Sequence, residues 1–171
     1  VGYGSIGRRL GKIARAIGME LLIYDPFLCP IDIEEVGVKK AERLEELMTN
    51  SDFITCHMKV TPQTTGIISR EMIALMKPTA YFINSSRGAI LDEQALIDAL
   101  REKRIAGAAF DVYAKEPIAS NHPYITELDN VVITPHIAGA TDDVLVNHTK
   151  QIVADIQRFI EGRPMLYEYK M

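Results

Sequence analysis

The chain has 171 residues, of which 47% are hydrophobic and 25% charged. This composition is typical of a globular protein and excludes a disordered, collagen-like or coiled-coil chain. The net charge of −4 provides no basic footprint for nucleic acid, and the apolar runs are far shorter than the roughly 20 residues that span a membrane. Cys29 and Cys56 form neither a CxxC motif nor a disulfide framework, so a reducing cytoplasm is the expected compartment.

The sequence begins with Val1 and continues directly into a glycine-rich segment. A glycine turn of this kind ordinarily follows a strand, and Val1 is all that precedes it. We therefore expect the chain to be a piece of a longer protein or a processed product, with one domain as the expected count.

Short apolar segments alternate with amphipathic ones in chain order. Helices are predicted over residues 6–17, 41–48, 93–102 and 142–161, and strands over 21–25, 52–57, 80–84, 106–112 and 131–135. The strands are apolar on both faces, as buried parallel strands are. The first helix gathers its apolar residues on one face, Asp92 is a predicted N-cap, and Gly162 ends the last helix. This alternation predicts an α/β fold with a doubly wound parallel sheet.

The segment from Gly2 to Gly7 reads GYGSIG, a GxGxxG motif that opens the first predicted helix. Gly2 permits a tight turn, Gly4 lets the backbone approach a pyrophosphate, and Gly7 permits close packing of helix and strand. The free N–H groups of the helix N-terminus would bind the phosphates. Asp25 follows at about the spacing of a ribose-binding acid, and its charge favours NAD over NADP. The alternative is a purely structural turn, in which Asp25 caps the loop before Pro26.

Polar residues also follow the other predicted strands. They are His57, Asn84 with Arg87, Asp111 and His136. Ligands of doubly wound sheets bind outside the carboxyl ends of the strands, so these residues mark a candidate site.

Three of the candidates could act together. His136 is a natural acid–base group, Glu116 could hydrogen-bond its imidazole and fix its tautomer, and Arg87 is a planar donor suited to a carboxylate. This set suits hydride transfer between a nicotinamide and a 2-hydroxy or 2-keto acid. Each residue has an ordinary alternative: a structural histidine, a loop acid before proline, or a surface arginine.

Four further segments carry a family resemblance. They are NSSRGAILDEQAL, GAAFDVYAKEP, NVVITPHIAGAT and the loop from His57 to Ile68. Together with the glycine motif and Asp25, they resemble the NAD-binding domain of the D-isomer specific 2-hydroxyacid dehydrogenases, and the phosphoglycerate dehydrogenase-like members in particular. The resemblance runs from Gly2 to about Gly162. It implies an NAD-binding domain over residues 1–140, and a helix and tail over 141–171 that return toward a substrate domain.

The resemblance also implies the roles of individual residues. Arg87, Glu116 and His136 occupy the catalytic positions, and no metal is expected. The cofactor-binding positions are Gly2, Gly4, Ser5, Ile6 and Gly7 at the pyrophosphate, Asp25 at the adenosine ribose, His57, Val60 and Thr65 on the adenosine side, and Ser85, Ser86, Arg87, Asp111, His136 and Gly139 near the nicotinamide.

Two departures accompany the resemblance. Lys59 stands where many members carry proline, and the substrate domain that precedes the nucleotide domain is absent from this sequence. Glu116 speaks against the formate dehydrogenase branch, which carries glutamine at this position. The family implies a small acid as substrate and a homodimer of the full-length protein.

Three functions remain open at this point. The first is an NAD-dependent 2-hydroxyacid dehydrogenase. The second is an NAD(H)-sensing corepressor-like binding module of the same fold. The third is a domain that binds NAD without turnover. Phosphite oxidation is a minor alternative on the same fold.

Overall fold

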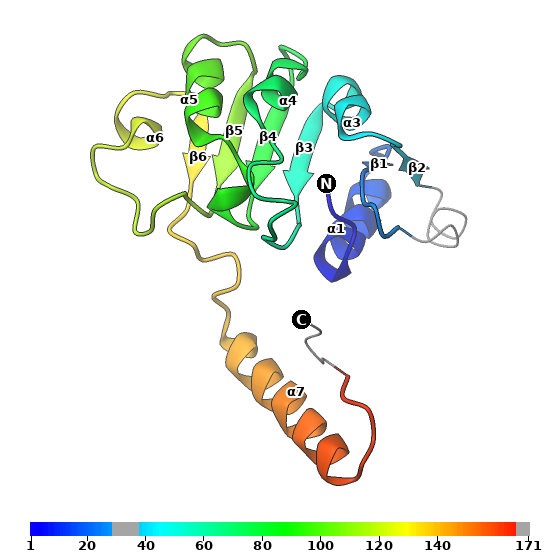
Figure 1. Ribbon diagram of the computed structural model, residues 1–171. Coiled ribbons are helices and arrows are strands. Elements are labelled where there is room, and N and C mark those ends of the chain that lie inside the picture. The colour runs from blue at the N-terminus through cyan, green and yellow to red at the C-terminus, as the bar shows by residue number, and fades with distance from the viewer. Residues whose placement is uncertain (29–37, 167–171) are drawn as a thin grey trace. The chain divides into compact units, whose positions relative to one another are not determined.

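The computed structural model describes residues 1–28 and 38–166 (Figure 1). Cys29 and the last residues of the tail lie outside the described residues. The chain divides into two compact units, Val1–Pro135 and His136–Met171, each of which is described by itself. The domain boundary expected after residue 140 stays a prediction.

The first unit contains a parallel sheet of four strands in the order β3-β4-β5-β6. Their bounds are Phe53–Cys56, Tyr81–Asn84, Gly107–Phe110 and Val131–Ile133. A second parallel pair joins β1 (Leu22–Ile23) to β2 (Lys39–Lys40). All the predicted strands are confirmed, in shortened form. The sequence analysis missed β2, because two lysines carry no apolar pattern.

Val1 links the two sheets through its backbone. Its amino group donates to the Thr55 carbonyl oxygen at 2.7 Å, and its own carbonyl accepts from the His57 N–H at 2.8 Å. On the other side, the Gly2 N–H donates to the Tyr24 carbonyl at 2.9 Å. Val1 therefore stands between β1 and β3, where Figure 1 marks the N-terminus. The strand order on either side of it is that of a doubly wound sheet, which confirms the predicted fold class.

The first helix of this unit precedes β1, and the others connect successive strands. The helices are α1 (Ser5–Ala16), α3 (Leu44–Asn50), α4 (Arg70–Ala74), the 3₁₀ helix η1 (Gly88–Ile90), α5 (Glu93–Arg101) and α6 (Pro123–Thr126). The predicted N-cap is confirmed, since the Asp92 carboxylate accepts from the Ala95 N–H at 2.9 Å. The short α4 and α6 were not predicted, because a helix of one turn shows no periodicity. In the second unit, α7 (Asp142–Ile160) ends at Gly162, whose φ is +68°.

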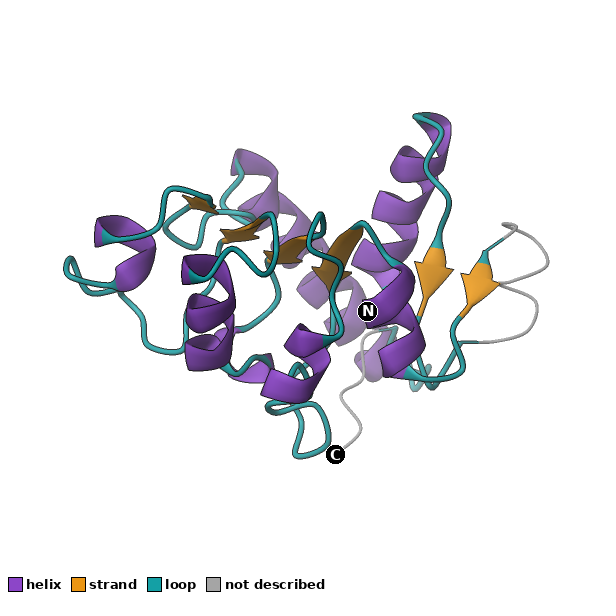
Figure 2. Ribbon diagram, turned by 90° about the horizontal axis from the view of Figure 1, so that it is seen from above, coloured by secondary structure: helices purple, strands orange, loops and turns teal. Residues whose placement is uncertain are grey.

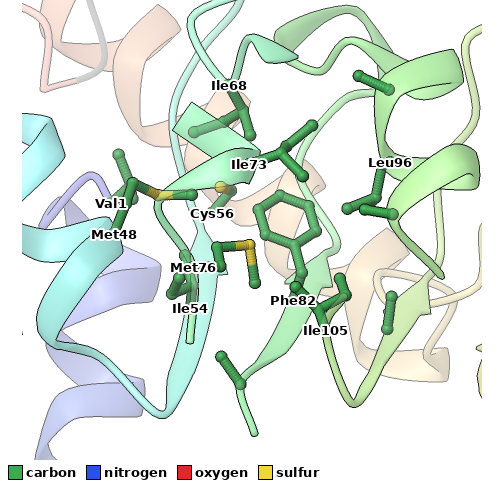
Figure 3. Packing of buried hydrophobic residues seen from close by; sticks show 14 of the residues in the cluster. Val1, Met48, Ile54, Cys56, Ile68, Ile73, Met76, Phe82, Leu96 and Ile105 are labelled. Atoms are coloured by element: carbon green, nitrogen blue, oxygen red, sulfur yellow. The ribbon is translucent and has the colours of Figure 1, made fainter. Parts of the chain in front are cut away.

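The hydrophobic core lies on one face of the four-stranded sheet, the face that α4 and α5 cover, as Figure 1 and Figure 2 show. Alternate strand residues such as Ile54 and Phe82 point into it and are fully buried. Figure 3 shows the Phe82 ring surrounded by Ile73, Met76 and Ile105. Cys56 is also fully buried, and burial raises the pKa of its thiol to about 11. This confirms Cys56 as a small core residue rather than a nucleophile.

The apolar face of α1 is exposed, unlike the apolar stripe of a helix that packs against a core. Ile6, Ile13 and Ile17 are 67%, 61% and 72% exposed, and the helix instead buries Gly7 and Gly11. A Cβ placed on Gly11 would lie 3.0 Å from the Tyr3 hydroxyl oxygen and from Leu21. The helix therefore approaches its neighbours through glycines. In the second unit, α7 likewise buries none of its described side chains. Among the described helices, none is long and apolar enough to cross a membrane.

Tyr124 provides a test of this core. Its ring stacks on Phe110 at 4.4 Å between centroids, but its buried hydroxyl has no hydrogen-bond partner among the described residues. A buried hydroxyl without a partner costs about 1 kcal/mol or more. We expect Tyr124→Phe to leave the free energy of unfolding in urea unchanged or raise it by about 1 kcal/mol. Tyr113→Phe is the control and should lower it, because the Tyr113 hydroxyl donates to the Thr134 carbonyl at 2.7 Å.

Candidate functional site

The glycine turn is built by close backbone contacts. Gly2 has a φ of +83°, and a Cβ on it would lie 3.0 Å from the His57 backbone. A Cβ on Gly7 would lie 2.5 Å from the Gly2 carbonyl oxygen. Gly4 differs, because a Cβ there would have no described atom beyond its chain neighbours within 4 Å. Protein packing therefore explains Gly2 and Gly7, while the surface above Gly4 is open to a ligand.

The N-terminus of α1 begins at this open surface. Gly4 is its N-cap residue, and within the described chain no side chain caps the helix. By contrast, Ser69 caps α4 and Asp92 caps α5. The first turn of α1 also contains no acidic residue. Uncapped amides and the positive end of the helix dipole suit a phosphate group, so the turn fits the pyrophosphate of a dinucleotide.

Asp25 lies just after β1 and contacts the glycine turn. Its carboxylate accepts from the Tyr3 N–H at 2.6 Å and from the Phe27 N–H at 2.9 Å. Asp25 therefore does cap the loop that follows β1, as the alternative interpretation expects. Each carboxylate oxygen can accept more than one hydrogen bond, so the residue keeps acceptor capacity for a ribose hydroxyl.

The loop after β3 runs from the glycine turn toward the loop that follows β4. At its start, His57 packs against Gly2 and lies 3.0 Å from the Thr55 hydroxyl through its Nε2 atom. At its end, the Gly66 N–H donates to the Ala89 carbonyl at 2.9 Å. Within this loop Val60 is 43% exposed, and the Thr65 hydroxyl donates to the Thr61 carbonyl.

His57 is half-buried at the carboxyl end of β3. Burial lowers the pKa of its imidazole to about 4. The ring is therefore neutral around pH 7, which suits an uncharged wall beside a nucleoside rather than an acid–base role.

The loop that carries Arg87 is organised by Asn84, which is 1% exposed at the end of β4. The Asn84 amide donates to the Arg87 carbonyl at 2.9 Å and accepts from both the N–H and the hydroxyl of Ser86. Arg87 and Ser85 are exposed. The guanidinium of Arg87 thus lies at the surface, on a loop whose backbone is fixed by hydrogen bonds to the buried Asn84 side chain.

The loop after β5 lies next to that of Arg87. Asp111 is buried, donates its N–H to the Asn84 carbonyl at 3.0 Å, and accepts a hydrogen bond from the Thr134 hydroxyl. The Glu116 carboxylate accepts from the Tyr113 N–H at 3.1 Å. The structure therefore brings the loops of Arg87, Asp111 and Glu116 together at one edge of the sheet.

His136 and Gly139 belong to the second unit. Their position relative to Arg87 and Glu116 is not described, and the convergence of the three catalytic candidates stays a prediction. One local feature of His136 stands out: its φ is +56°, in the left-handed region that a residue other than glycine seldom adopts. Such conformations cluster at functional sites.

Asn84 was among the polar residues expected at the strand ends, and the structure shows that it organises the loop of Arg87. An asparagine at the end of a strand commonly closes a turn through its side chain, which is the role that Asn84 has here. Tyr113 and Thr134 also organise the site and were not predicted as site residues. Tyr113 and Thr134 carry no local signal, since their contact joins residues 21 positions apart. Within the described ranges, no three His, Cys, Asp or Glu side chains gather into a metal-binding group.

The fold and the glycine turn define a dinucleotide-binding domain, and comparison with known proteins identifies its family. Residues 1–138 match the model of the D-isomer specific 2-hydroxyacid dehydrogenase, NAD binding domain. The chain belongs to this family, as the resemblance of its motifs implied, and NAD is its cofactor class.

Individual relatives agree with this assignment. The chain is 40% identical to a D-3-phosphoglycerate dehydrogenase of Synechocystis over 96% of its length and 29% of the relative's. The D-lactate dehydrogenase of Aquifex aeolicus, complexed with NAD and lactic acid, is 33% identical with a TM-score of 0.80, over 94% of this chain and 52% of that one. A family member from Xanthobacter autotrophicus, in complex with NADPH and MES, is 30% identical with a TM-score of 0.88, over 99% and 68%. The chain spans half or less of the first curated relatives it matches.

The glycine turn generates a prediction that separates folding from binding. Gly7→Ala should destabilise the fold by about 1–3 kcal/mol, because the new Cβ would overlap the Gly2 carbonyl. Gly4→Ala should stay within about 1 kcal/mol of the wild type in urea unfolding, since its Cβ enters open space. Isothermal titration should nevertheless show NADH binding to Gly4→Ala weakened about tenfold. Wild-type NADH affinity in Gly4→Ala would contradict the pyrophosphate role.

Proposed function

We propose that the protein is an NAD-dependent oxidoreductase that transfers a hydride between nicotinamide and a D-2-hydroxy or 2-keto acid. One observation carries this proposal: the loops of Arg87 and Glu116 lie side by side at one edge of the sheet. A glycine turn with an open amide surface belongs to the same sheet edge. Family membership supports the same reaction class.

The chain's own residues would hold the cofactor in three groups. Gly4, Ser5 and Ile6 would present backbone amides to the pyrophosphate on a turn that Gly2 and Gly7 shape, and Asp25 would accept from the adenosine ribose. His57, Val60 and Thr65 would line the adenosine side. Ser85, Ser86, Arg87, Asp111, His136 and Gly139 would surround the nicotinamide. The open space at Gly4 and the uncapped α1 support this placement.

The reaction divides between the cofactor and three side chains. Bound NADH would supply the hydride to the carbonyl carbon. Arg87 would pair with the substrate carboxylate and orient the adjacent carbonyl. His136 would donate a proton to the ketone oxygen in reduction and accept it in oxidation, and Glu116 would orient the imidazole and favour its protonated form.

We further propose a homodimer and a cytoplasmic setting. The exposed isoleucines of α1, at positions 6, 13 and 17, support an interface on this helix. The cytoplasmic setting rests on the two cysteines, which form neither a CxxC motif nor a disulfide framework.

The first experiment is a titration of the 171-residue chain with NADH and with NADPH, followed by a screen of 2-keto acids. The fluorescence of the cofactor reports binding, since the chain contains no tryptophan. Saturable binding that favours NADH, with oxidation of NADH by a keto acid, is the expected result. Binding without turnover, in this chain and in any longer form that carries it, would favour the NAD(H)-sensing module instead.

His136 tests the chemistry. We expect His136→Ala to lower kcat about 10²–10⁴-fold, the usual contribution of a general acid–base group. The Kd for NADH should stay within about twofold, because the imidazole acts on the substrate oxygen. His148→Ala, on α7, removes a histidine outside the proposed site and serves as the control. An equal loss of NADH affinity and rate in His136→Ala would refute the assigned role.

Asp25 tests the choice of cofactor. Asp25→Ser should reduce the ratio of the Kd for NADPH to the Kd for NADH, because the carboxylate charge that repels a 2′-phosphate is lost. Serine still accepts a hydrogen bond from the neighbouring amides. Asp52→Ser is the matched control, since it removes the same charge at the amino end of β3, where Asp52 pairs with Lys77. An unchanged ratio in Asp25→Ser would show that another group selects the cofactor.

A further inference from the structure

Tyr113 lies at the centre of contacts that join the three loops of the proposed site. It is 6% exposed and stands between Asp111 at the end of β5 and Glu116. Its backbone N–H donates to the Glu116 carboxylate at 3.1 Å. The side chain that would orient the catalytic histidine is therefore held by the backbone of Tyr113.

The same backbone contacts the loop of Arg87. A Cβ placed on Gly88 would lie 2.1 Å from the carbonyl carbon and oxygen of Tyr113, and 2.5 Å from the Ala114 nitrogen. No side chain larger than hydrogen fits between these two segments. The backbone that directly follows Arg87 thus rests on Tyr113, and Asn84 holds the Arg87 carbonyl from the other side.

The phenol of Tyr113 reaches the third loop. Its hydroxyl donates to the Thr134 carbonyl at 2.7 Å, and the Thr134 N–H donates to the Phe110 carbonyl at 2.9 Å. Burial, with the carboxylates of Asp111 and Glu116 nearby, raises the pKa of the phenol, so the hydroxyl stays protonated and can donate. Only two residues of chain, at most about 7 Å, lead from Thr134 to His136.

We propose that Tyr113 is a positioning residue for the reaction, which holds the loops of Arg87 and Glu116 against each other and anchors the chain from which His136 departs. This inference rests on the proposed function. The ring alone would fill the core, so the hydroxyl is the atom that distinguishes positioning from packing. Its loss should loosen the geometry of the proton-transfer groups and leave the distant adenosine side intact.

The test compares Tyr113→Phe with the wild type. Both are assayed first in the 171-residue chain, and in a longer form of the protein if that chain shows no turnover. We expect kcat for 2-keto acid reduction to fall about tenfold, because small displacements of reacting groups are costly. The Kd for NADH should stay within about twofold. The high-pH limb of the kcat profile should move to lower pH, since a His136 whose preceding segment is less firmly anchored pairs less well with Glu116, which then stabilises the protonated imidazole less.

Two further variants make the test specific. Glu116→Gln should move the same limb in the same direction and farther, because it removes the carboxylate charge. Tyr124→Phe is the matched control: it also deletes a buried phenol hydroxyl, but one with no partner among the described residues, so kcat and the pH profile should be unchanged. Urea unfolding of each variant verifies that the protein is folded under the assay conditions.

The outcomes separate the two proposals. If Glu116→Gln moves the limb and Tyr113→Phe does not, the role of Tyr113 is refuted while the proposed function stands. If Tyr124→Phe has the same effect as Tyr113→Phe, the effect is one of packing and the positioning role is again refuted. If Glu116→Gln leaves the profile unchanged, or no form turns over, the proposed chemistry fails and this inference fails with it.

Discussion

The parallel register of β3, β4 and β5 is the constraint on which the rest of the structure depends. Cys56 pairs with Asn84, and Asn84 with Phe110, so the three strands end at the same level. The residue that follows each of these ends begins a loop of the proposed site. A parallel sheet needs a crossover helix after every strand, so its loops gather at one edge without any residue being selected for that purpose. The chemistry then depends on how each loop is held.

Close backbone approach is the means by which these loops are held. Gly7 admits the carbonyl of Gly2, Gly11 admits the ring of Tyr3, and Gly88 admits the backbone of Tyr113. A Cβ on Gly7 or Gly88 would overlap main-chain atoms and force two segments apart, whereas a Cβ on Gly11 would meet side-chain atoms of Tyr3 and Leu21. The contacts at Gly7 and Gly88 depend on main-chain atoms, so they position a loop without using the side chains that face the ligand. Gly4 differs from these three glycines, because a Cβ there would enter open space.

Much of this arrangement could be predicted from local pattern. The strands were predictable because their apolar runs are continuous, and Arg87 and Asp111 because they follow strand ends. The α1 stripe was harder to interpret: Ile6 and Ile13 have helical spacing, but periodicity does not state what a face packs against. The contact from Tyr113 to Thr134 had no signal at all. It joins segments that only the finished sheet brings together.

The backbone of His136 is strained, and the segment just before it is firmly anchored. A left-handed residue other than glycine costs about 1–3 kcal/mol and persists only where its surroundings determine it. Lys103, the other such residue described, lies in an exposed turn after α5, where its N–H donates to the Leu100 carbonyl at 3.1 Å. Before His136 the chain is held at Thr134 by its N–H, its hydroxyl and its carbonyl. The segment that leads into His136 is thus held at Thr134, in part by the hydroxyl of Tyr113, whose backbone N–H also donates to the Glu116 carboxylate.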